Sequence, residues 1–191
     1  MAVDKALFRS AAGSFGSGVT VITAGFEGSY HGMTASAFTS LSLEPPQVLV
    51  CVNRETRALS IIEACGCFCV NVLDAEQEGL SRLFASKDAS QRDGLDGIDF
   101  VPGELGVPVL DRVLAFFECR VVQEYDGGDH VIVVGEVEHV GAAQEGEPLL
   151  YFRGSYRQFS RKESVAAPPI DGLFSSGWRR EALTRWGGLP D

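Results

Sequence analysis

A run of small and hydroxylated residues between positions 33 and 46 is the part of this sequence best suited to binding chemistry. It ends in Pro45 and Pro46, which cannot extend a helix, and an apolar segment at residues 48–52 follows. Small side chains leave main-chain N–H groups and hydroxyls uncovered, so a flat, hydrogen-bonding ligand can lie against the backbone. A hydrophobic core has little use for such residues, whereas a pocket for a polar aromatic cofactor does.

Two further segments are suited to an anionic group. Residues 53–56 connect the apolar segment to the start of an expected helix, and helix N-termini attract anions through unpaired N–H groups and the helix dipole. Thr56 could cap that helix, bind a phosphate, or do both. Lys87 follows a second expected helix, where it could either interact with the helix C-terminus or serve as counter-charge to a phosphate.

His130 is the histidine best placed for ligand chemistry. It follows the turn signal at residues 126–129 and therefore begins a strand near one end of the sheet. An imidazole there can donate a hydrogen bond to a ligand carbonyl or phosphate, and a solvent-facing hairpin histidine is the alternative. No Gly-x-Ser-x-Gly elbow surrounds a serine of the polar run, so a serine nucleophile is not indicated.

Two other spacings resemble binding motifs but favour structural roles. Cys65, Cys67 and Cys69 alternate on an expected strand, which would direct all three to one face and suits core packing better than a zinc site. The odd total of five cysteines argues against a disulfide framework. Glycines at residues 13–18 reverse the dinucleotide-binding spacing and precede a strand, which excludes a Rossmann site.

The elements that must position these residues are mostly strands. We expect strands at residues 19–24, 30–39, 47–53, 67–73, 112–124, 129–140 and 149–152, and helices at residues 2–16, 56–64 and 74–86. The first helix is expected to carry Leu7, Phe8 and Phe15 inward. Ala58, Leu59 and Ile62 share one side of the second helix, and Asp74 with Gln77 resembles a capping box that opens the third. Hairpins connect neighbouring strands and no βαβ alternation occurs, so we predict a mainly β fold with short helices in which a closed antiparallel barrel hides the sheet edges.

Length and composition limit the class of protein further. The 191 residues suit one domain at residues 1–163 and a C-terminal extension at residues 164–191. We expect a short helix in the extension, with Trp178 and Trp186 docked on the barrel or on a partner subunit. The net charge of −10 excludes nucleic acid and anionic membranes as partners. No signal peptide or membrane span is indicated, so we expect a cytoplasmic protein.

Taken together and in this order, the motifs resemble the flavin reductase family, whose fold is the FMN-binding split barrel. The resemblance covers residues 5–160. The matching motifs are residues 18–23, 32–38, 40–42 with Pro45 and Pro46, Asn53 with Thr56, Phe84 with Ala85, 128–130, and 148–151 with Gly154 and Tyr156. The family often has Ser where this chain has Thr56, and the hydroxyl is retained.

The resemblance implies an NAD(P)H:flavin oxidoreductase of a two-component monooxygenase, usually a homodimer. It would transfer hydride from NADH or NADPH to FMN or FAD and supply the reduced flavin to a separate monooxygenase, with no metal. The residues implied are Thr34, Ala35 and Ser36 for the isoalloxazine ring; Cys51, Val52, Asn53, Thr56, Phe84, Ala85 and Lys87 for the ribityl chain and phosphate; and His130 and Tyr156 for the nicotinamide.

The expected chemistry needs no protein nucleophile, because the cofactors carry the hydride transfer and the protein holds two flat rings face to face. Two other interpretations stay open at this point. One is a non-catalytic flavin- or haem-binding split barrel, and the other is a flavoprotein that retains its flavin and reduces an organic substrate.

Overall fold

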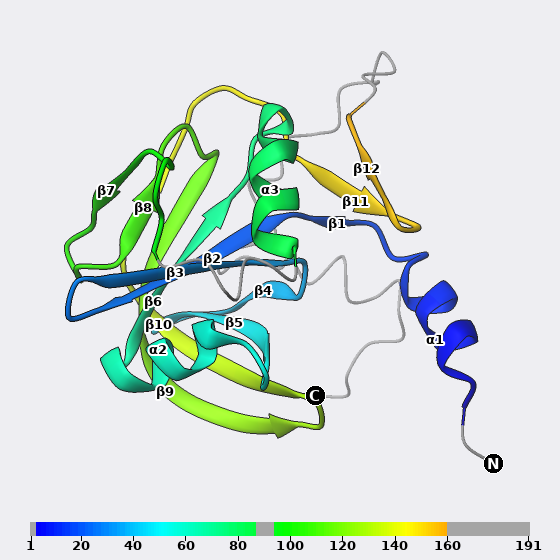
Figure 1. Ribbon diagram of the computed structural model, residues 1–191, viewed down its shortest axis with the longest axis horizontal. Helices are drawn as coiled ribbons and strands as arrows, with labels where there is room; N and C mark the ends of the chain where they lie inside the picture. The colour runs from blue at the N-terminus through cyan, green and yellow to red at the C-terminus, as the bar shows by residue number, and fades with distance from the viewer. Residues whose placement is uncertain (1–2, 87–93, 160–191) are drawn as a thin grey trace, which may run out of the picture. The chain divides into compact units, whose positions relative to one another are not determined.

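The computed structural model describes residues 3–86 and 94–159, and strands make up most of this part of the chain (Figure 1). The C-terminal extension predicted from the sequence lies outside the described residues, as does Lys87. In chain order the elements are α1 Lys5–Ala12, β1 Ser17–Gly18, β2 Thr20–Phe26, β3 Ser29–Ala35, β4 Phe38–Leu43, β5 Pro46–Asn53, α2 Arg57–Cys65, β6 Cys67–Val72, η1 Ala75–Gln77, α3 Glu78–Ala85, β7 Phe100–Pro102, β8 Pro108–Leu110, β9 Ala115–Gly127, β10 His130–Ala142, β11 Leu150–Phe152 and β12 Ser155–Arg157.

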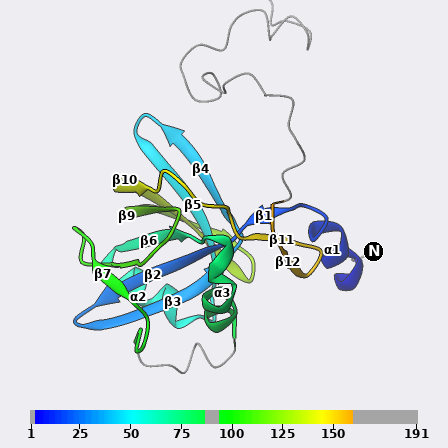
Figure 2. The same ribbon diagram turned by 90° about the horizontal axis from the view of Figure 1, so that it is seen from above.

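A seven-stranded antiparallel sheet in the order β3-β2-β6-β9-β10-β5-β4 forms the body of the protein (Figure 2). Strands β3 and β4 are its two edges, and no ladder joins them within the described residues. The mainly β fold with short helices is therefore confirmed, but closure of the barrel is not. The sheet stays open between its edges β3 and β4, and a cavity described below lies between β3 and β5.

The core lies on both faces of the central strands, which explains their unbroken apolar sequences. Helix α2 packs one face, with Ala58, Leu59 and Ile62 buried as its helical spacing predicted. Helix α3 packs against the other face together with residues of β2 and the 95–110 segment. The capping box predicted from Asp74 and Gln77 is present and opens η1, which leads directly into α3.

The cysteine prediction was half right. Cys67 and Cys69 are buried in β6, as expected for core packing. Cys65 does not lie on that strand, because it is the last residue of α2 and Gly66 ends the helix in a left-handed conformation with φ of 67°. The alternation expected of a strand does not apply to Cys65, because helix α2 continues through this residue, beyond the end that the apolar pattern of the sequence indicated.

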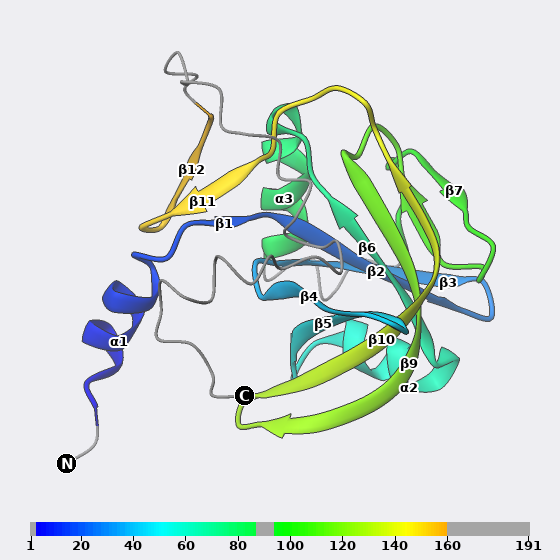
Figure 3. The same ribbon diagram turned by 180° about the vertical axis from the view of Figure 1, so that it is seen from behind.

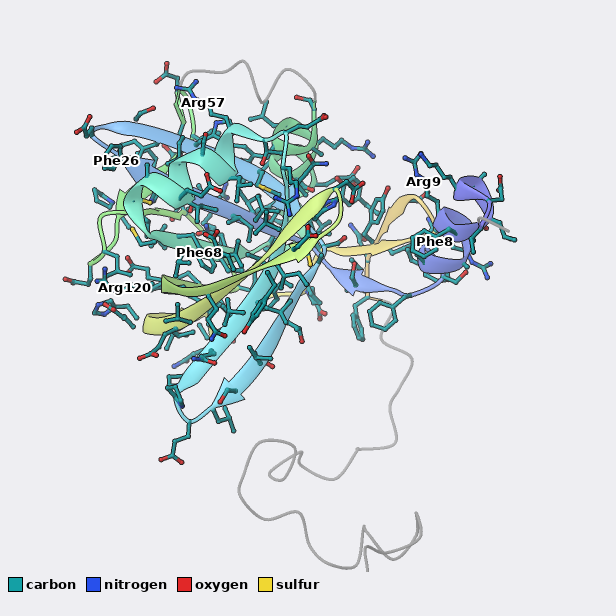
Figure 4. The ribbon with its side chains drawn as sticks, turned by 90° about the horizontal axis from the view of Figure 1, so that it is seen from below. Phe8, Arg9, Phe26, Arg57, Phe68 and Arg120 are labelled. Atoms are coloured by element: carbon teal, nitrogen blue, oxygen red, sulfur yellow. The ribbon has the colours of Figure 1, made fainter. Side chains whose placement is uncertain are left out.

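The prediction that the first helix points its apolar residues inward was wrong. Helix α1 stands away from the seven-stranded sheet, and Leu7, Phe8 and Phe15 are 67%, 64% and 82% exposed (Figure 4). It lies beside the small sheet β1-β11-β12, to which the segment after it is linked by a hydrogen bond from the Arg153 N–H to the Gly13 carbonyl (Figure 3). An amphipathic pattern predicts an apolar face but not which surface covers it.

The described helices include none that is both long and apolar enough to cross a membrane.

Candidate functional site

A cavity of about 740 Å³ is lined by residues of β3, β5, the start of α2 and the end of α3. Cofactor sites commonly have volumes in this range. Its lining residues are His31, Gly32, Met33, Thr34, Ala35, Ser36, Ala37, Cys51, Asn53, Glu55, Thr56, Phe84, Ala85, Ser86 and His130.

The edge of β3 supplies one wall of this cavity. Within the described residues β3 pairs with β2 alone, so the main-chain groups along its other edge have no strand partner. The short side chains at residues 34–37 leave that backbone accessible. Gly32 is required here, because a Cβ at this position would lie 2.6 Å from the ring of Phe84, which closes the cavity from α3. The polar run of the sequence therefore lies at the wall of a cavity, beside the unpaired edge of β3.

The N-terminus of α2 forms a second wall. Thr56 is its N-cap residue, but the Thr56 hydroxyl donates to the Asn53 carbonyl at 2.8 Å and no side chain caps the helix. Helix α1 differs, because its Asp4 carboxylate accepts a hydrogen bond from the Leu7 N–H. The start of α2 lies beside the cavity, so the helix dipole favours an anionic ligand such as a phosphate there.

His130 lines the cavity, and hydrogen bonds and an ion pair hold in place the turn that carries it. Its Nδ1 lies 2.7 Å from Oδ1 of Asp129, and this contact holds the pKa of the Asp129 carboxyl below its usual value. Arg54 bonds to the same turn through its N–H to the Asp129 carbonyl, its Nε to the Gly128 carbonyl and an ion pair with Asp126. The turn that carries His130 is therefore fixed to the segment between β5 and α2.

Tyr156 is connected to the cavity but does not line it. The Tyr156 hydroxyl and the Ser81 hydroxyl are 2.8 Å apart, and Arg82 lies over the tyrosine ring, 4.8 Å from its centroid. The Ser81 carbonyl in turn accepts a 2.7 Å hydrogen bond from the hydroxyl of Thr34. Tyr156 therefore orients α3 against β3, one side chain away from the wall of the cavity.

Sequence reasoning missed several lining residues, of which His31 is the most informative. It is 4% exposed, and burial, followed by the charge of Arg57, lowers the pKa of its imidazole. A lowered pKa keeps the ring neutral near pH 7, so it offers a hydrogen bond rather than a positive charge. The strand period was the available signal, because His31 precedes Met33 by two residues and shares its face. Glu55 and Ser86 were also missed.

The structure brings nine of the twelve predicted residues together around one cavity. These are Thr34, Ala35, Ser36, Cys51, Asn53, Thr56, Phe84, Ala85 and His130. Val52 is not among them, because strand alternation turns its side chain away from Cys51 and Asn53 into the core, where it is fully buried. Tyr156 lies one side chain away, as described above, and Lys87 lies outside the described residues.

These features would suit a flat, polar ligand with an anionic group, bound beside a sheet edge. A comparison with protein families identifies it further. Residues 12–160 match the model of the "Flavin reductase like domain", so the chain belongs to that family. The resemblance inferred from the motifs is thereby confirmed, and with it the class of enzyme, an oxidoreductase.

Relatives of known activity cover most of the chain. The flavin-dependent monooxygenase reductase subunit HsaB of Mycobacterium tuberculosis is 41% identical over 173 residues, which is 90% of this chain and 91% of the relative. Nitrilotriacetate monooxygenase component B from Mycobacterium thermoresistibile superposes with a TM-score of 0.80 at 38% identity, covering 89% of this chain and 94% of the other. The NADH:FAD oxidoreductase SgcE6 of Streptomyces globisporus, solved with NAD and FAD fragments, gives 0.78 at 38% identity, with 84% and 96% covered.

Proposed function

We propose that this protein transfers hydride from NADH or NADPH to FMN or FAD bound in the cavity beside β3, and that it supplies the reduced flavin to a separate flavin-dependent monooxygenase. The observation that carries the proposal is the cavity itself, which joins the sheet edge at β3 to the start of helix α2 at Thr56. Both parts match a flavin, whose ring is flat and whose chain ends in phosphate. The activities named for the relatives support the same chemistry.

Within this proposal the ring lies against residues 34–36 and the phosphate reaches the first turn of α2. Asn53 and Cys51 line the path between them, and Phe84 with Ala85 closes the far side. Main-chain N–H groups aimed at the ring would stabilise the negative charge that forms as the flavin accepts hydride. Val52 can contribute only through its backbone, because its side chain lies in the core.

His130 is proposed to meet the nicotinamide. It lies at the open mouth of the cavity, where a second flat ring could stack on the flavin at about 3–3.5 Å, the separation that hydride transfer requires. We propose that Tyr156 acts indirectly, by holding α3 and Thr34 through Ser81. When bound, the flavin and nicotinamide supply the redox chemistry, and the protein supplies orientation and exclusion of water.

The architecture around the site extends the proposal. We retain the split-barrel interpretation, in which β3 and β5 approach across the cavity without a ladder, with residues 1–163 as the reductase domain and residues 164–191 as an extension. We also propose a homodimer, in which a second copy covers the exposed apolar residues Leu7, Phe8 and Phe15 of the α1 region. All five cysteines are free thiols, which suits a protein of the cytoplasm.

One assay tests the function. Purified protein is mixed with NADH or NADPH, with and without added FMN or FAD, and the loss of nicotinamide absorbance is followed. The proposal predicts turnover that increases with added flavin. A coloured protein with no nicotinamide oxidation would indicate a flavin carrier, and turnover that is independent of added flavin would indicate an enzyme that retains its cofactor.

A further inference from the structure

His31 is a buried polar side chain on the cavity wall whose hydrogen-bonding capacity is unused. It is 4% exposed, and within residues 3–86 and 94–159 its imidazole has no hydrogen-bond partner. In the same part of the chain, no side-chain nitrogen or oxygen is sealed from solvent without a partner. Because His31 lines the cavity, its unpaired ring nitrogen opens into that cavity, where a ligand can bond to it.

Two contacts place His31 opposite the first turn of α2. Side chains two residues apart on a strand share a face, so Ser29, His31 and Met33 point the same way from β3. Nη2 of Arg57 lies 3.4 Å from the Ser29 hydroxyl oxygen. The Thr56 hydroxyl oxygen lies 4.0 Å from the Met33 sulfur. His31 stands between these two contacts on β3, so it faces the residues at which α2 begins.

The charged and titratable groups around His31 come from three elements of the described chain. The start of α2 contributes Glu55 and Arg57, β5 contributes Cys51, and β10 contributes His130. The lining residues of α3 are uncharged, and β2, which pairs with β3, has no ionisable side chain. Burial, followed by the charge of Arg57, lowers the pKa of His31, so the ring is neutral near pH 7.

An anion bound at the start of α2 would reverse this balance. The helix dipole favours negative charge there, and a phosphate monoester carries about −1.5 to −2 charges at pH 7. An opposite charge within about 4–6 Å favours the protonated form of a histidine. The place that disfavours a positive imidazole by itself therefore favours one when a phosphate lies beside it.

We propose that His31 is a phosphate-binding residue, which donates a hydrogen bond to the flavin phosphate at the start of α2 and takes up one proton from solvent as the phosphate binds. The proton adds to the unpaired ring nitrogen, so that both ring nitrogens become donors. This inference rests on the proposed function for the identity of the ligand. It adds a linked proton that hydride transfer itself does not require, and flavin affinity should rise as pH falls through the interval in which the ring gains its charge.

The second histidine on the cavity has a different environment. His130 is partly exposed, and its Nδ1 already has a partner in the carboxylate of Asp129, at 2.7 Å. Its ring is therefore engaged within the protein, whereas that of His31 is not. The two histidines serve as internal controls for each other, because the phosphate should change the titration of His31 more than that of His130.

The experiment counts protons by isothermal titration of the full-length protein with FMN, in buffers of different ionisation enthalpy. Riboflavin, which lacks the phosphate, is the control ligand. At pH 7 the wild-type protein should take up about half a proton or more with FMN, and none with riboflavin. His31→Gln keeps a hydrogen-bonding side chain that does not titrate, so it should take up at least about half a proton less and bind FMN about tenfold more weakly.

A matched variant controls for the substitution itself. His139→Gln changes an exposed histidine of β10 and should equal the wild-type protein in proton uptake and FMN affinity. Comparing the variants with the wild-type protein also cancels any proton that the FMN phosphate exchanges with solvent.

A second measurement keeps the test valid if His31→Gln does not fold. The chain has three histidines, so NMR of wild-type protein with labelled imidazole rings can follow each of them. The ring of His31, assigned by substituting the other two, should titrate at a higher pH with FMN than with riboflavin.

The outcomes separate this inference from the proposed function. FMN binding without proton uptake, or equal uptake with FMN and riboflavin, would overturn the role of His31 and leave the reductase proposal intact. Proton uptake through His31 in a protein that does not oxidise NADH or NADPH would support the phosphate site and contradict only the hydride transfer. Failure to bind FMN at all would overturn both.

Discussion

The two ends of α2 differ in what they offer to an anion. At the N-terminus, Thr56 leaves the first turn uncapped beside a cavity, and the helix dipole favours negative charge there. At the C-terminus the dipole disfavours negative charge, yet the pKa of the Cys65 thiol falls to about 6. A helix dipole contributes about 0.3–1 kcal/mol at an exposed terminus, whereas a hydrogen bond to a charged group contributes about 1.5–3 kcal/mol.

Local donors therefore decide where this protein stabilises negative charge, and the dipole only adds to them or opposes them. At Cys65 the neighbouring groups are internal: hydrogen bonding with the Cys67 side chain lowers the pKa of the thiol, although its Sγ also lies 2.9 Å from the Cys67 carbonyl oxygen. At the Thr56 end the helix dipole acts on whatever ligand the cavity binds. The Thr56 end is thus expected to depend on the chemistry of the bound molecule, and the Cys65 end is expected to be independent of it.

The largest effect should come from a side chain that fills the cavity beside the N-terminus of α2. In Gly32→Leu the new side chain would collide with Phe84, whose ring would lie only 2.6 Å from the added Cβ. We expect flavin affinity to fall by about 100-fold, or ~2.7 kcal/mol, and the free energy of unfolding to fall by about 1–3 kcal/mol through overpacking. Isothermal titration with FMN and urea denaturation measure the two quantities.

Gly79→Ala is the matched control for that variant. Gly79 lies in α3, the same helix as Phe84, but nothing lies within 4 Å of a Cβ there. It should bind flavin normally and unfold with a free energy higher by about 0.5–1 kcal/mol. Equal flavin affinity in Gly32→Leu and wild type would place the flavin elsewhere.

The next largest effect should separate stability from binding at the N-terminus of α2. In Thr56→Asp the carboxylate would cap the first turn and raise the free energy of unfolding by about 0.3–1 kcal/mol. The same charge should weaken FMN binding about tenfold, or ~1.4 kcal/mol, through repulsion of the phosphate. Riboflavin lacks the phosphate, so its affinity should stay unchanged in parallel titrations, and an equal loss for both ligands would refute the phosphate assignment.

A smaller and more selective effect is expected at the mouth of the cavity. His130→Ala removes a ring that we place beside the nicotinamide, and loss of one hydrogen bond of about 1–1.5 kcal/mol should raise KM for NADH by about 5–10-fold. The affinity of the same variant for flavin should change by less than about twofold. His139→Ala, an exposed position on the same strand β10, serves as control. Unchanged KM and kcat in steady-state assays would argue against the nicotinamide role.

The smallest effect should come from Cys65 at the C-terminus of α2, and it concerns the free energy of unfolding. A thiol whose pKa is lowered to about 6 by folding stabilises the native state once pH exceeds the unfolded value near 9.0, and this contribution is lost as pH falls through 6. The stability difference between wild type and Cys65→Ser should therefore grow from pH 6 to pH 9, by less than about 1 kcal/mol because Cys65 is partly solvated. Urea denaturation across this pH range measures the difference, and a flat profile would contradict the thiolate.

The sequence predicted features that depend on neighbouring residues along the chain. The period of Ala58, Leu59 and Ile62 predicted α2, and the Asp74–Gln77 pair predicted the cap before α3. The polar run predicted that a backbone-lined pocket would lie beside residues 34–36, where the cavity occurs. These signals are local, so one sequence was sufficient to find them.

Features set by distant contacts were missed or wrong. The inward side of α1 depends on what packs against it, which the helix pattern does not contain. His31 enters the cavity only because β3 is an edge strand, a fact of sheet order. Val52 is an error of a different kind, because strand alternation, a local signal, would have separated it from its neighbours Cys51 and Asn53.

The unpaired edge of β3 also has a consequence for handling the protein in solution. A strand with open main-chain groups can recruit another strand, and proteins usually discourage this with Lys or Pro. Residues 29–35 contain neither, nor any acidic residue. A ligand bound along this edge would block the addition of a strand from another molecule. Concentrated solutions of the protein should therefore aggregate more slowly when flavin is kept in the buffer.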